Sequence, residues 1–340
     1  MTQPLNVTVL GGGSFGTAIA RVLSENNPSV TLWMRSEQQA RDIRENRENS
    51  QYMPGVFLPE AIRPSTCLKE SIAGADVVFV ALPSKVFRQV IRDAAGLFPQ
   101  GQMVISTTKG IEQEGFKLMS EVLEEEIPQT RVGVLSGPNL AAEMVRGELT
   151  ASVIASAHDE VRQTVQSLLG CDYFRVYANV DLYGVELGGA LKNIYAIISG
   201  LAAARGMGEN TRSMLITRSL AEMSRFAVSL GANPMTFMGL AGVGDLIVTC
   251  TSDKSRNYRV GYALGQGASL DDAVARLGQV AEGVQTLLLV REKARAMGVH
   301  MPLVQGLYEI LYNKASIGDV VKALMSATQN SDVEFILPRQ

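Results

Sequence analysis

The 340-residue sequence predicts an α/β protein whose N-terminal half folds as a doubly wound parallel sheet and whose C-terminal half is all helical. Three observations predict this. Short apolar runs alternate with helical patterns in the first half, as in strand–helix–strand units. A glycine-rich turn joins the first run to the first helix. After about residue 180, strand patterns become rare and long helical patterns follow. We therefore expect two domains, at 1–180 and 181–340.

The expected strands are short, apolar and rich in β-branched residues, as strands buried on both faces of a parallel sheet are. They cover residues 6–10, 29–34, 76–83, 102–108, 131–136, 151–156 and 173–179, and helical patterns at 14–26 and 118–127 lie between them. In the second domain, helical patterns cover 184–204, 211–231, 282–298 and 302–314.

Composition narrows the functional classes. A net charge of −3 and the lack of lysine or arginine runs argue against nucleic-acid partners. The three cysteines are far apart, so we expect no metal site, no disulfide framework and a reducing, cytoplasmic location. No signal-peptide pattern follows Met1. Residues 187–204 are long enough to span a membrane, but their glycine and alanine content and central lysine favour a core helix.

The glycine-rich turn has the spacing of a dinucleotide site. Gly11, Gly13 and Gly16 form G-x-G-x-x-G directly after a strand and at the start of a helix, the Rossmann arrangement. The first glycine permits the turn, the second lets the backbone approach a pyrophosphate, and the third allows close helix–strand packing. The alternative is a glycine-rich turn without a ligand.

The end of the second strand bears on the choice of dinucleotide. An NAD site usually has an acidic residue here to hold the ribose hydroxyls. This sequence has Arg35 at that place, and Glu37 follows slightly late. Because arginine pairs well with a 2′-phosphate, we expect NADP to be accepted as well as NAD. The alternative is that Arg35 is a solvated loop charge.

Between Leu187 and Ala204, the helix expected at 184–204 carries only one charged residue, Lys192. An apolar stripe lies on one face, and small residues surround Lys192 on the other face, where a water-exposed helix would carry charges. We expect this face to look across a cleft to the other domain, with Lys192 exchanging a proton or polarising a carbonyl. The two histidines, His158 and His300, lie in surface-like turns. The structural alternative is an interdomain salt bridge, for example to Asp245.

Other candidates follow strands or interrupt apolar runs. Lys109 comes directly after an expected strand, at the sheet edge where doubly wound folds bind ligands. Gly137 ends another strand, and Asp245 is an isolated carboxylate in a glycine-rich apolar run. Ser255, Arg256 and Asn257 form a donor cluster suited to a phosphate. The alternatives are that Lys109 is a surface lysine in a turn, that Asp245 caps a helix and that Arg256 is part of a solvated loop.

Together these motifs resemble the bacterial-type NAD(P)-dependent glycerol-3-phosphate dehydrogenases. The resemblance is carried by GGGSFGTA (11–18), TTKG (107–110), SGP (136–138), VELGGALKN (185–193), GVGDLIVTCTSDKSRN (242–257) and GQVAEG (278–283). It implies a helical domain like that of 6-phosphogluconate dehydrogenase. It also implies reversible reduction of dihydroxyacetone phosphate to sn-glycerol 3-phosphate, which supplies glycerophospholipid synthesis.

The resemblance also implies roles for individual residues. Lys192 would be the catalytic acid and base. Substrate would be bound by Lys109, Gly137, Lys192, Asp245, Ser255, Arg256 and Asn257. The cofactor, NADP or NAD, would contact Gly11, Gly13, Ser14, Phe15, Gly16, Arg35, Lys109, Ala141, Arg256, Val280 and Glu282. Asn139 departs from the family's usual small hydroxyl residue, which leaves a role for its side chain open.

Two other functions remain open on the sequence. One is another two-domain hydroxyacid dehydrogenase, such as a ketopantoate reductase, whose substrate carboxylate would also bind arginine. The other is a non-catalytic redox sensor that binds NAD(P). Such a sensor would keep the glycine loop without needing Lys192, Asp245 and Arg256. We also expect a homodimer formed through the helical domain.

Overall fold

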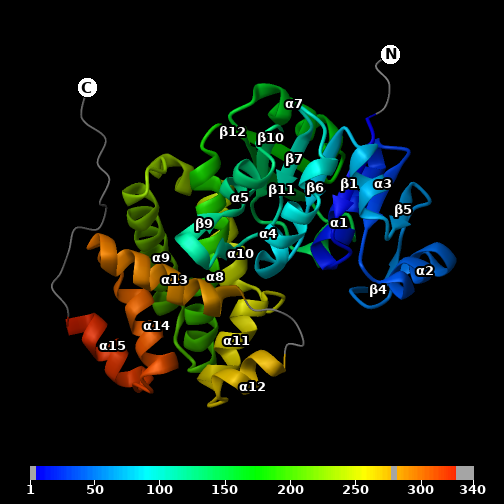
Figure 1. Ribbon diagram of the computed structural model, residues 1–340. Helices are drawn as coiled ribbons and strands as arrows, with labels where there is room; N and C mark the ends of the chain where they lie inside the picture. Colours follow the sequence, from blue (N-terminus) through cyan, green and yellow to red (C-terminus); the bar gives the residue numbers. More distant parts are fainter. Residues whose placement is uncertain (1–4, 277–281, 327–340) are drawn as a thin grey trace. The chain divides into compact units, whose positions relative to one another are not determined.

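The computed structural model of the protein describes residues 5–276 and 282–326 (Figure 1). The chain forms two compact units, Met1–Glu186 and Leu187–Gln340. The boundary between them falls inside helix α8 (Leu182–Ala204). The units are therefore described one at a time.

The first unit is built on one eight-stranded sheet with the order β12-β11-β10-β7-β6-β1-β2-β5. All neighbouring pairs are parallel except β10 with β11. The strands are β1 (Val7–Leu10), β2 (Val30–Trp33), β5 (Ile62–Ser65), β6 (Val77–Val80), β7 (Met103–Ser106), β10 (Arg131–Ser136), β11 (Thr150–Ala155) and β12 (Phe174–Asn179). This doubly wound sheet followed by a helical unit confirms the predicted fold class.

Helices cover both faces of this sheet, as its apolar strands require. On one face lie α1 (Ser14–Asn26), α6 (Ala141–Met144) and α7 (Asp159–Leu169), with α2 (Glu37–Asn46) towards the β5 edge. On the other face lie α3 (Leu68–Ala73), α4 (Ser84–Asp93) and α5 (Met119–Glu126). Alternate residues of each strand enter the two cores, so Val9 packs on one side and Leu10 on the other.

Two strands of the eight-stranded sheet differ from the sequence prediction. Strand β11, expected to be parallel, is antiparallel to β10. The connection between them contains only the four-residue helix α6, which is too short to carry the chain back across the sheet for a parallel return. Strand β5 was not among the expected strands, and it contains Pro64, a residue that is confined to edge strands within sheets. It is tolerated because β5 lies at the sheet edge.

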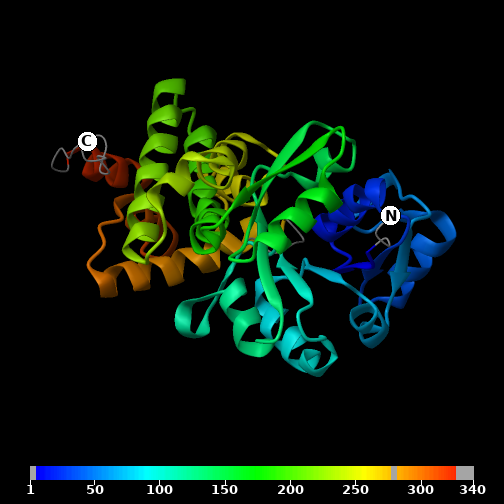
Figure 2. The same ribbon diagram turned by 90° about the horizontal axis from the view of Figure 1, so that it is seen from above.

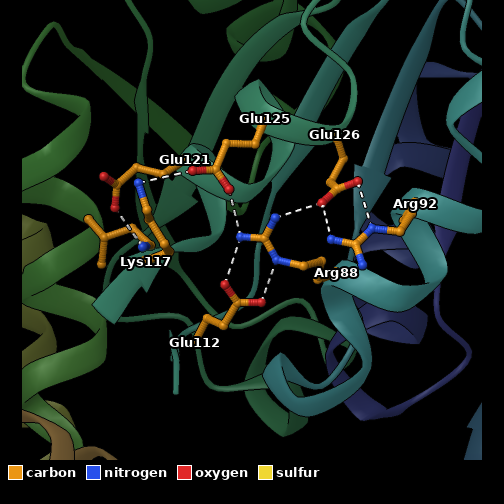
Figure 3. Close-up of polar contacts among 8 residues, drawn as sticks. Arg88, Arg92, Glu112, Lys117, Glu121, Glu125 and Glu126 are labelled. Atoms are coloured by element: carbon orange, nitrogen blue, oxygen red, sulfur yellow. Dashed lines mark hydrogen bonds and ion pairs between the residues drawn. The ribbon is translucent and has the colours of Figure 1, made fainter. Parts of the chain in front are cut away.

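A network of ion pairs holds the segment that follows Lys109 (Figure 3). Strands β8 (Ile111–Glu112) and β9 (Lys117–Leu118) form a short hairpin there. The Arg88 guanidinium on α4 donates hydrogen bonds to both carboxylate oxygens of Glu112, at 2.6 and 2.7 Å. It also forms ion pairs with Glu125 and Glu126 of α5. Hydrogen bonds from Arg92 and Arg88 lower the pKa of Glu126 to about 2. The hairpin is therefore tied to two helices of its own unit.

The second unit is helical throughout its described residues (Figures 1 and 2). After α8 come α9 (Glu209–Ser229), α10 (Asp245–Thr251), α11 (Arg256–Gly265), α12 (Leu270–Ala275), α13 (Glu282–Met297), α14 (Pro302–Tyr312) and α15 (Ile317–Ser326). By length and composition α8 is the one described helix that could cross a membrane, but 83% of its apolar window is buried inside the protein. That burial is typical of a core helix.

A carboxyl group is completely buried in this unit. Glu222 of α9 accepts a hydrogen bond from the backbone N–H of Leu303, at the start of α14, at 2.8 Å. Burial raises the pKa of Glu222 to about 8, although the backbone donors and Tyr195 oppose the shift. The folded protein therefore keeps a proton on Glu222 at neutral pH.

This proton makes stability depend on pH. Unfolded Glu222 loses its proton near its ordinary pKa of 4.5, and the folded group near 8. Because the folded state binds more protons in this window, the free energy of unfolding should fall as pH rises, by at most about 1.4 kcal/mol per pH unit. Thermal unfolding of Glu222→Gln should depend less steeply on pH than that of wild type. The exposed Glu209→Gln is the control. Equal slopes for wild type and Glu222→Gln would contradict the assignment.

Candidate active site

The glycine loop in the first unit has the geometry that its spacing predicted. Gly11 has a φ of +125°, and a side chain there would overlap the carbonyl oxygen of Ala81. A side chain at Gly16 would overlap the carbonyl of Gly11, so α1 lies directly against the end of β1. Gly13, the N-cap of α1, faces open space. This leaves the N–H groups at the start of α1 accessible to an anion.

The neighbouring candidates differ in what they contact. The hydroxyl of Ser14 donates to the backbone carbonyl of Tyr52 at 3.3 Å. Phe15 and Ala141 are half-buried against the same core, and α6 packs on α1. The two side chains therefore lie on the glycine-loop side of the sheet.

The carboxyl end of β2 presents a cation and not an acid. Arg35 is exposed, and its guanidinium forms no hydrogen bond or ion pair with any of residues 5–276 and 282–326. Glu37 is occupied by Arg44 at 2.8 Å and by the hydroxyl of Thr66 at 3.0 Å. Both oxygens of Glu37 are thus bound by neighbouring side chains. This favours Arg35 as the group that contacts a ligand.

Lys109 is held at the end of β7 by two oxygen atoms. Its ammonium donates to the carbonyl of Gly137 at 3.0 Å and to Oδ1 of Asn139 at 2.9 Å. Asn139 in turn donates to the hydroxyl of Ser152 at 3.1 Å. Lys109 is therefore fixed in place and not a freely moving surface lysine. Asn139, whose role the sequence left open, orients it.

These residues of the first unit fit a dinucleotide. The open face at Gly13 accommodates a pyrophosphate beside free N–H groups, and Arg35 provides a cation near the ribose end of such a ligand. Within the described ranges, no three His, Cys, Asp or Glu side chains gather in a way that could hold a metal ion.

In the second unit, Lys192 is buried and paired. Its side chain is 7% exposed and forms an ion pair with Asp245, the first residue of α10, and a hydrogen bond of 2.8 Å to the hydroxyl of Thr249. The salt bridge considered as the structural alternative is therefore present, but within one unit and not between domains. It does not remove a chemical role, because the ammonium remains next to an acid and a hydroxyl.

The small-residue face of α8 is covered by the same unit. A side chain at Gly188 would overlap the carbonyl of Ala241, just before α10, and one at Gly200 would overlap the carbonyl of Tyr258 in α11. The expectation that this face looks across a cleft to the other domain is thus wrong at Gly188. The glycines allow α10 and α11 to approach α8 closely, which brings Asp245 to Lys192.

The predicted donor cluster is partly used for structure. Ser255 is the N-cap of α11, and its hydroxyl accepts a hydrogen bond from the N–H of Tyr258 at 3.3 Å. Asn257 is buried, and its Oδ1 accepts from the N–H of Gly283 at 3.0 Å. Arg256, the first residue of α11, is exposed. A phosphate at this helix start would therefore meet Arg256 and backbone N–H groups first.

The loop predicted to close over the cofactor is described in part. Glu282 is the first residue of α13, and Val280 lies outside the described residues. A side chain at Gly283 would meet the carbonyl of Asn193 at 2.6 Å and Oδ1 of Asn257 at 2.7 Å. The start of α13 is therefore next to the residue that follows Lys192.

Sequence reasoning missed Thr249 and the role of Asn139. Thr249 stands four residues after Asp245, so both lie on one face of a helix, and this spacing would have been a usable signal. Asn139 is joined to Lys109 across 30 residues, and no local pattern indicates that pairing.

Comparisons with known proteins point to one family. A family model described as the N-terminus of NAD-dependent glycerol-3-phosphate dehydrogenase matches residues 6–162, and the model of its C-terminus matches residues 181–322. The chain is 58% identical over 330 residues to a glycerol-3-phosphate dehydrogenase [NAD(P)+] of Azotobacter vinelandii, covering 97% of each chain. It is 57% identical over 336 residues to one from Pseudomonas fluorescens, covering 99% of this chain and 98% of the relative.

A solved structure agrees. The glycerol-3-phosphate dehydrogenase of Coxiella burnetii is 34% identical, with a TM-score of 0.90 over 95% of this chain and 99% of that one.

Proposed function

The chain belongs to the NAD-dependent glycerol-3-phosphate dehydrogenase family, and we propose that it reduces dihydroxyacetone phosphate reversibly to sn-glycerol 3-phosphate, with Lys192 as catalytic acid and base. The protein is accordingly an NAD(P)-dependent oxidoreductase. The observation that carries the role of Lys192 is its burial beside Asp245 and Thr249, on the face of α8 where it is the only charge. The family membership favours this function over the ketopantoate reductase and redox-sensor alternatives.

The chemistry assigns one proton to Lys192. Bound NAD(P)H would supply the hydride for the ketone carbon. As the carbonyl oxygen gains negative charge, the Lys192 ammonium donates a proton to it, and in oxidation the neutral amine takes that proton back. The Asp245 carboxylate stabilises the ammonium form, and the Thr249 hydroxyl helps to fix the position of Nζ. Positioning and proton transfer therefore come from three side chains of two helices.

Substrate and cofactor are assigned to the remaining candidates. Arg256 and the N–H groups at the start of α11 would hold the substrate phosphate, and Ser255 and Asn257 would shape that helix start. Lys109 and Gly137 would also contact the substrate. The glycine loop with Ser14, Phe15, Arg35 and Ala141 would hold the cofactor, together with Val280 and Glu282.

The experiment that tests this function is oxidation of NADPH and NADH by the purified protein. Dihydroxyacetone phosphate should be reduced much faster than ketopantoate or unphosphorylated dihydroxyacetone. Preference for ketopantoate, or no turnover on any of them, would contradict the proposal.

Arg35 should select between the two cofactors. Arg35→Asp places an anion beside the 2′-phosphate, so it should raise the Kd for NADPH more than the Kd for NADH, by about tenfold in the ratio. Cofactor fluorescence measures both constants. Arg41→Asp, an exposed change on the following helix, is the control and should affect both cofactors little. Equal losses for NADPH and NADH in Arg35→Asp would mean that Arg35 points elsewhere.

Assembly and location stay predictions. We propose a cytoplasmic homodimer formed through the helical domain. Light scattering coupled to size-exclusion chromatography would test the dimer, and substitutions on the exposed face of that domain would locate its interface.

A further inference from the structure

Two buried amide side chains hold the carbonyl group of Gly12, in the middle of the glycine loop. Nδ2 of Asn49 donates to this oxygen at 2.9 Å, and Nε2 of Gln39 donates to the same oxygen. Asn49 has no exposed surface, and Gln39 is 9% exposed. Neither belongs to the glycine motif, because Gln39 lies on α2 and Asn49 ends β3 (Glu48–Asn49).

The two amides form a closed network with the first helix. Gln39 also donates to Oδ1 of Asn49 at 3.1 Å, and Nδ2 of Asn49 makes a second bond to the hydroxyl of Thr17 at 2.7 Å. Both hydrogens and the oxygen of the Asn49 amide are therefore used. A buried polar group whose donors and acceptor are all satisfied is rigid, because any movement breaks a hydrogen bond in a dry environment.

Fixing this carbonyl also fixes an N–H group on the other side of the same peptide plane. The peptide between Gly12 and Gly13 is trans, as all peptides of the described chain are, so its N–H points opposite to its C=O. The carbonyl is directed inward to Asn49 and Gln39, which directs the N–H of Gly13 outward. The face at Gly13 is open. The loop therefore presents a donor where a ligand can reach it.

The loop needs such support because glycine residues restrict the backbone conformation very little. A peptide flanked by two glycines can rotate at small steric cost, and rotation would turn the carbonyl oxygen towards the open face. An outward carbonyl would repel a phosphate. We propose that Asn49 and Gln39 are positioning residues that orient the Gly13 N–H towards the pyrophosphate of the dinucleotide. This inference rests on the proposed binding of the dinucleotide at the glycine loop.

The test compares ligands that differ in the pyrophosphate. Binding of ADP-ribose, which contains it, and of adenosine, which does not, is measured by displacement of NADPH fluorescence. In Asn49→Leu, a substitution of similar shape without donors, ADP-ribose should bind about tenfold more weakly while adenosine is unchanged. The KM for dihydroxyacetone phosphate at saturating NADPH should also stay within about twofold, because the substrate does not touch this peptide.

A matched control exists at the other end of the same helix. Asn27 is also buried, with 5% of its surface exposed, and its amide donates to the carbonyl of Leu23 at 2.7 Å, far along α1 from the loop. Asn27→Leu should lower the melting temperature comparably and leave the ratio of ADP-ribose to adenosine affinity unchanged. If Asn49→Leu does not fold, Gln39→Leu replaces it. Its control is then Gln102→Leu, whose amide binds the carbonyls of Ile72 and Ala75.

The outcomes separate this inference from the function on which it rests. Selective loss of ADP-ribose binding in the loop variants supports the positioning role. Equal losses for both ligands, or the same loss in the controls, overturn it while the glycine loop remains the cofactor site. If wild type binds adenosine as tightly as ADP-ribose, the pyrophosphate is not held at the loop, and both the proposed cofactor site and the positioning role are wrong.

Discussion

Lys192→Ala should lower kcat for dihydroxyacetone phosphate by at least 10²–10⁴-fold, the usual contribution of a general acid or base. The Kd for NADPH should change by less than about threefold, because Lys192 is not among the residues assigned to the cofactor. The expectation follows from the buried pairing of Lys192 with Asp245 and Thr249. Steady-state rates and cofactor fluorescence measure the two quantities separately.

Replacing Lys192 alone leaves the Asp245 carboxylate buried without the ammonium that forms an ion pair with it. Removing one partner of a buried ion pair costs about 3–5 kcal/mol of stability, since the other charge is uncompensated. The double variant Lys192→Met with Asp245→Asn removes both charges at similar volume and should fold. Lys322→Ala, an exposed change in the same unit, is the control and should keep full activity. Near-normal kcat in folded protein lacking Lys192 would show that another group transfers the proton.

Arg256→Ala should raise the KM for dihydroxyacetone phosphate by about ten- to a hundredfold, the effect expected for losing a charged hydrogen bond to a phosphate. It should also lower kcat, because a substrate held less firmly at one end is misaligned for hydride transfer. Activity on dihydroxyacetone, which has no phosphate, should hardly change. The measurement is therefore the ratio of kcat/KM values for the two substrates.

Two further variants sharpen this comparison. Arg256→Lys should also lower the ratio, because lysine keeps the charge without the two-pronged geometry. Arg259→Ala removes an exposed arginine one turn further along α11 and should leave the ratio unchanged. If the ratio of kcat/KM for the phosphorylated over the unphosphorylated substrate is the same in Arg256→Ala as in wild type, Arg256 does not bind the phosphate. The ketopantoate reductase function must then be reconsidered.

The parts of the fold that could be predicted are those with a local signal. The glycine loop is defined by spacing within six residues, and the strands of the sheet by continuous apolar runs. The direction of β11 was wrong because apolar composition does not record whether a strand runs parallel or antiparallel. The direction depends on the connection, and α6 is too short for a parallel crossover.

The site was predictable as a set of residues but not as a set of contacts. Lys192 stood out because a lone charge on a small-residue face needs a partner. Which elements cover that face could not be predicted, because a glycine pattern shows that something approaches closely without showing what. The same holds for Asn49, an ordinary polar residue in sequence whose importance arises only where β3 meets the glycine loop.

The close packing of α8 against α11 limits how this enzyme can be engineered for heat resistance. Replacing helical glycines with alanine is a common route to thermostability, since it reduces the freedom of the unfolded chain. At Gly200 and Gly261 the added methyl group would strike backbone of the opposite helix, at the carbonyls of Tyr258 and Ile197. The two helices would have to separate, carrying the start of α11 and Arg256 away from Lys192. A stabilisation library should therefore keep both glycines and draw its alanine substitutions from helix positions where the added carbon has room.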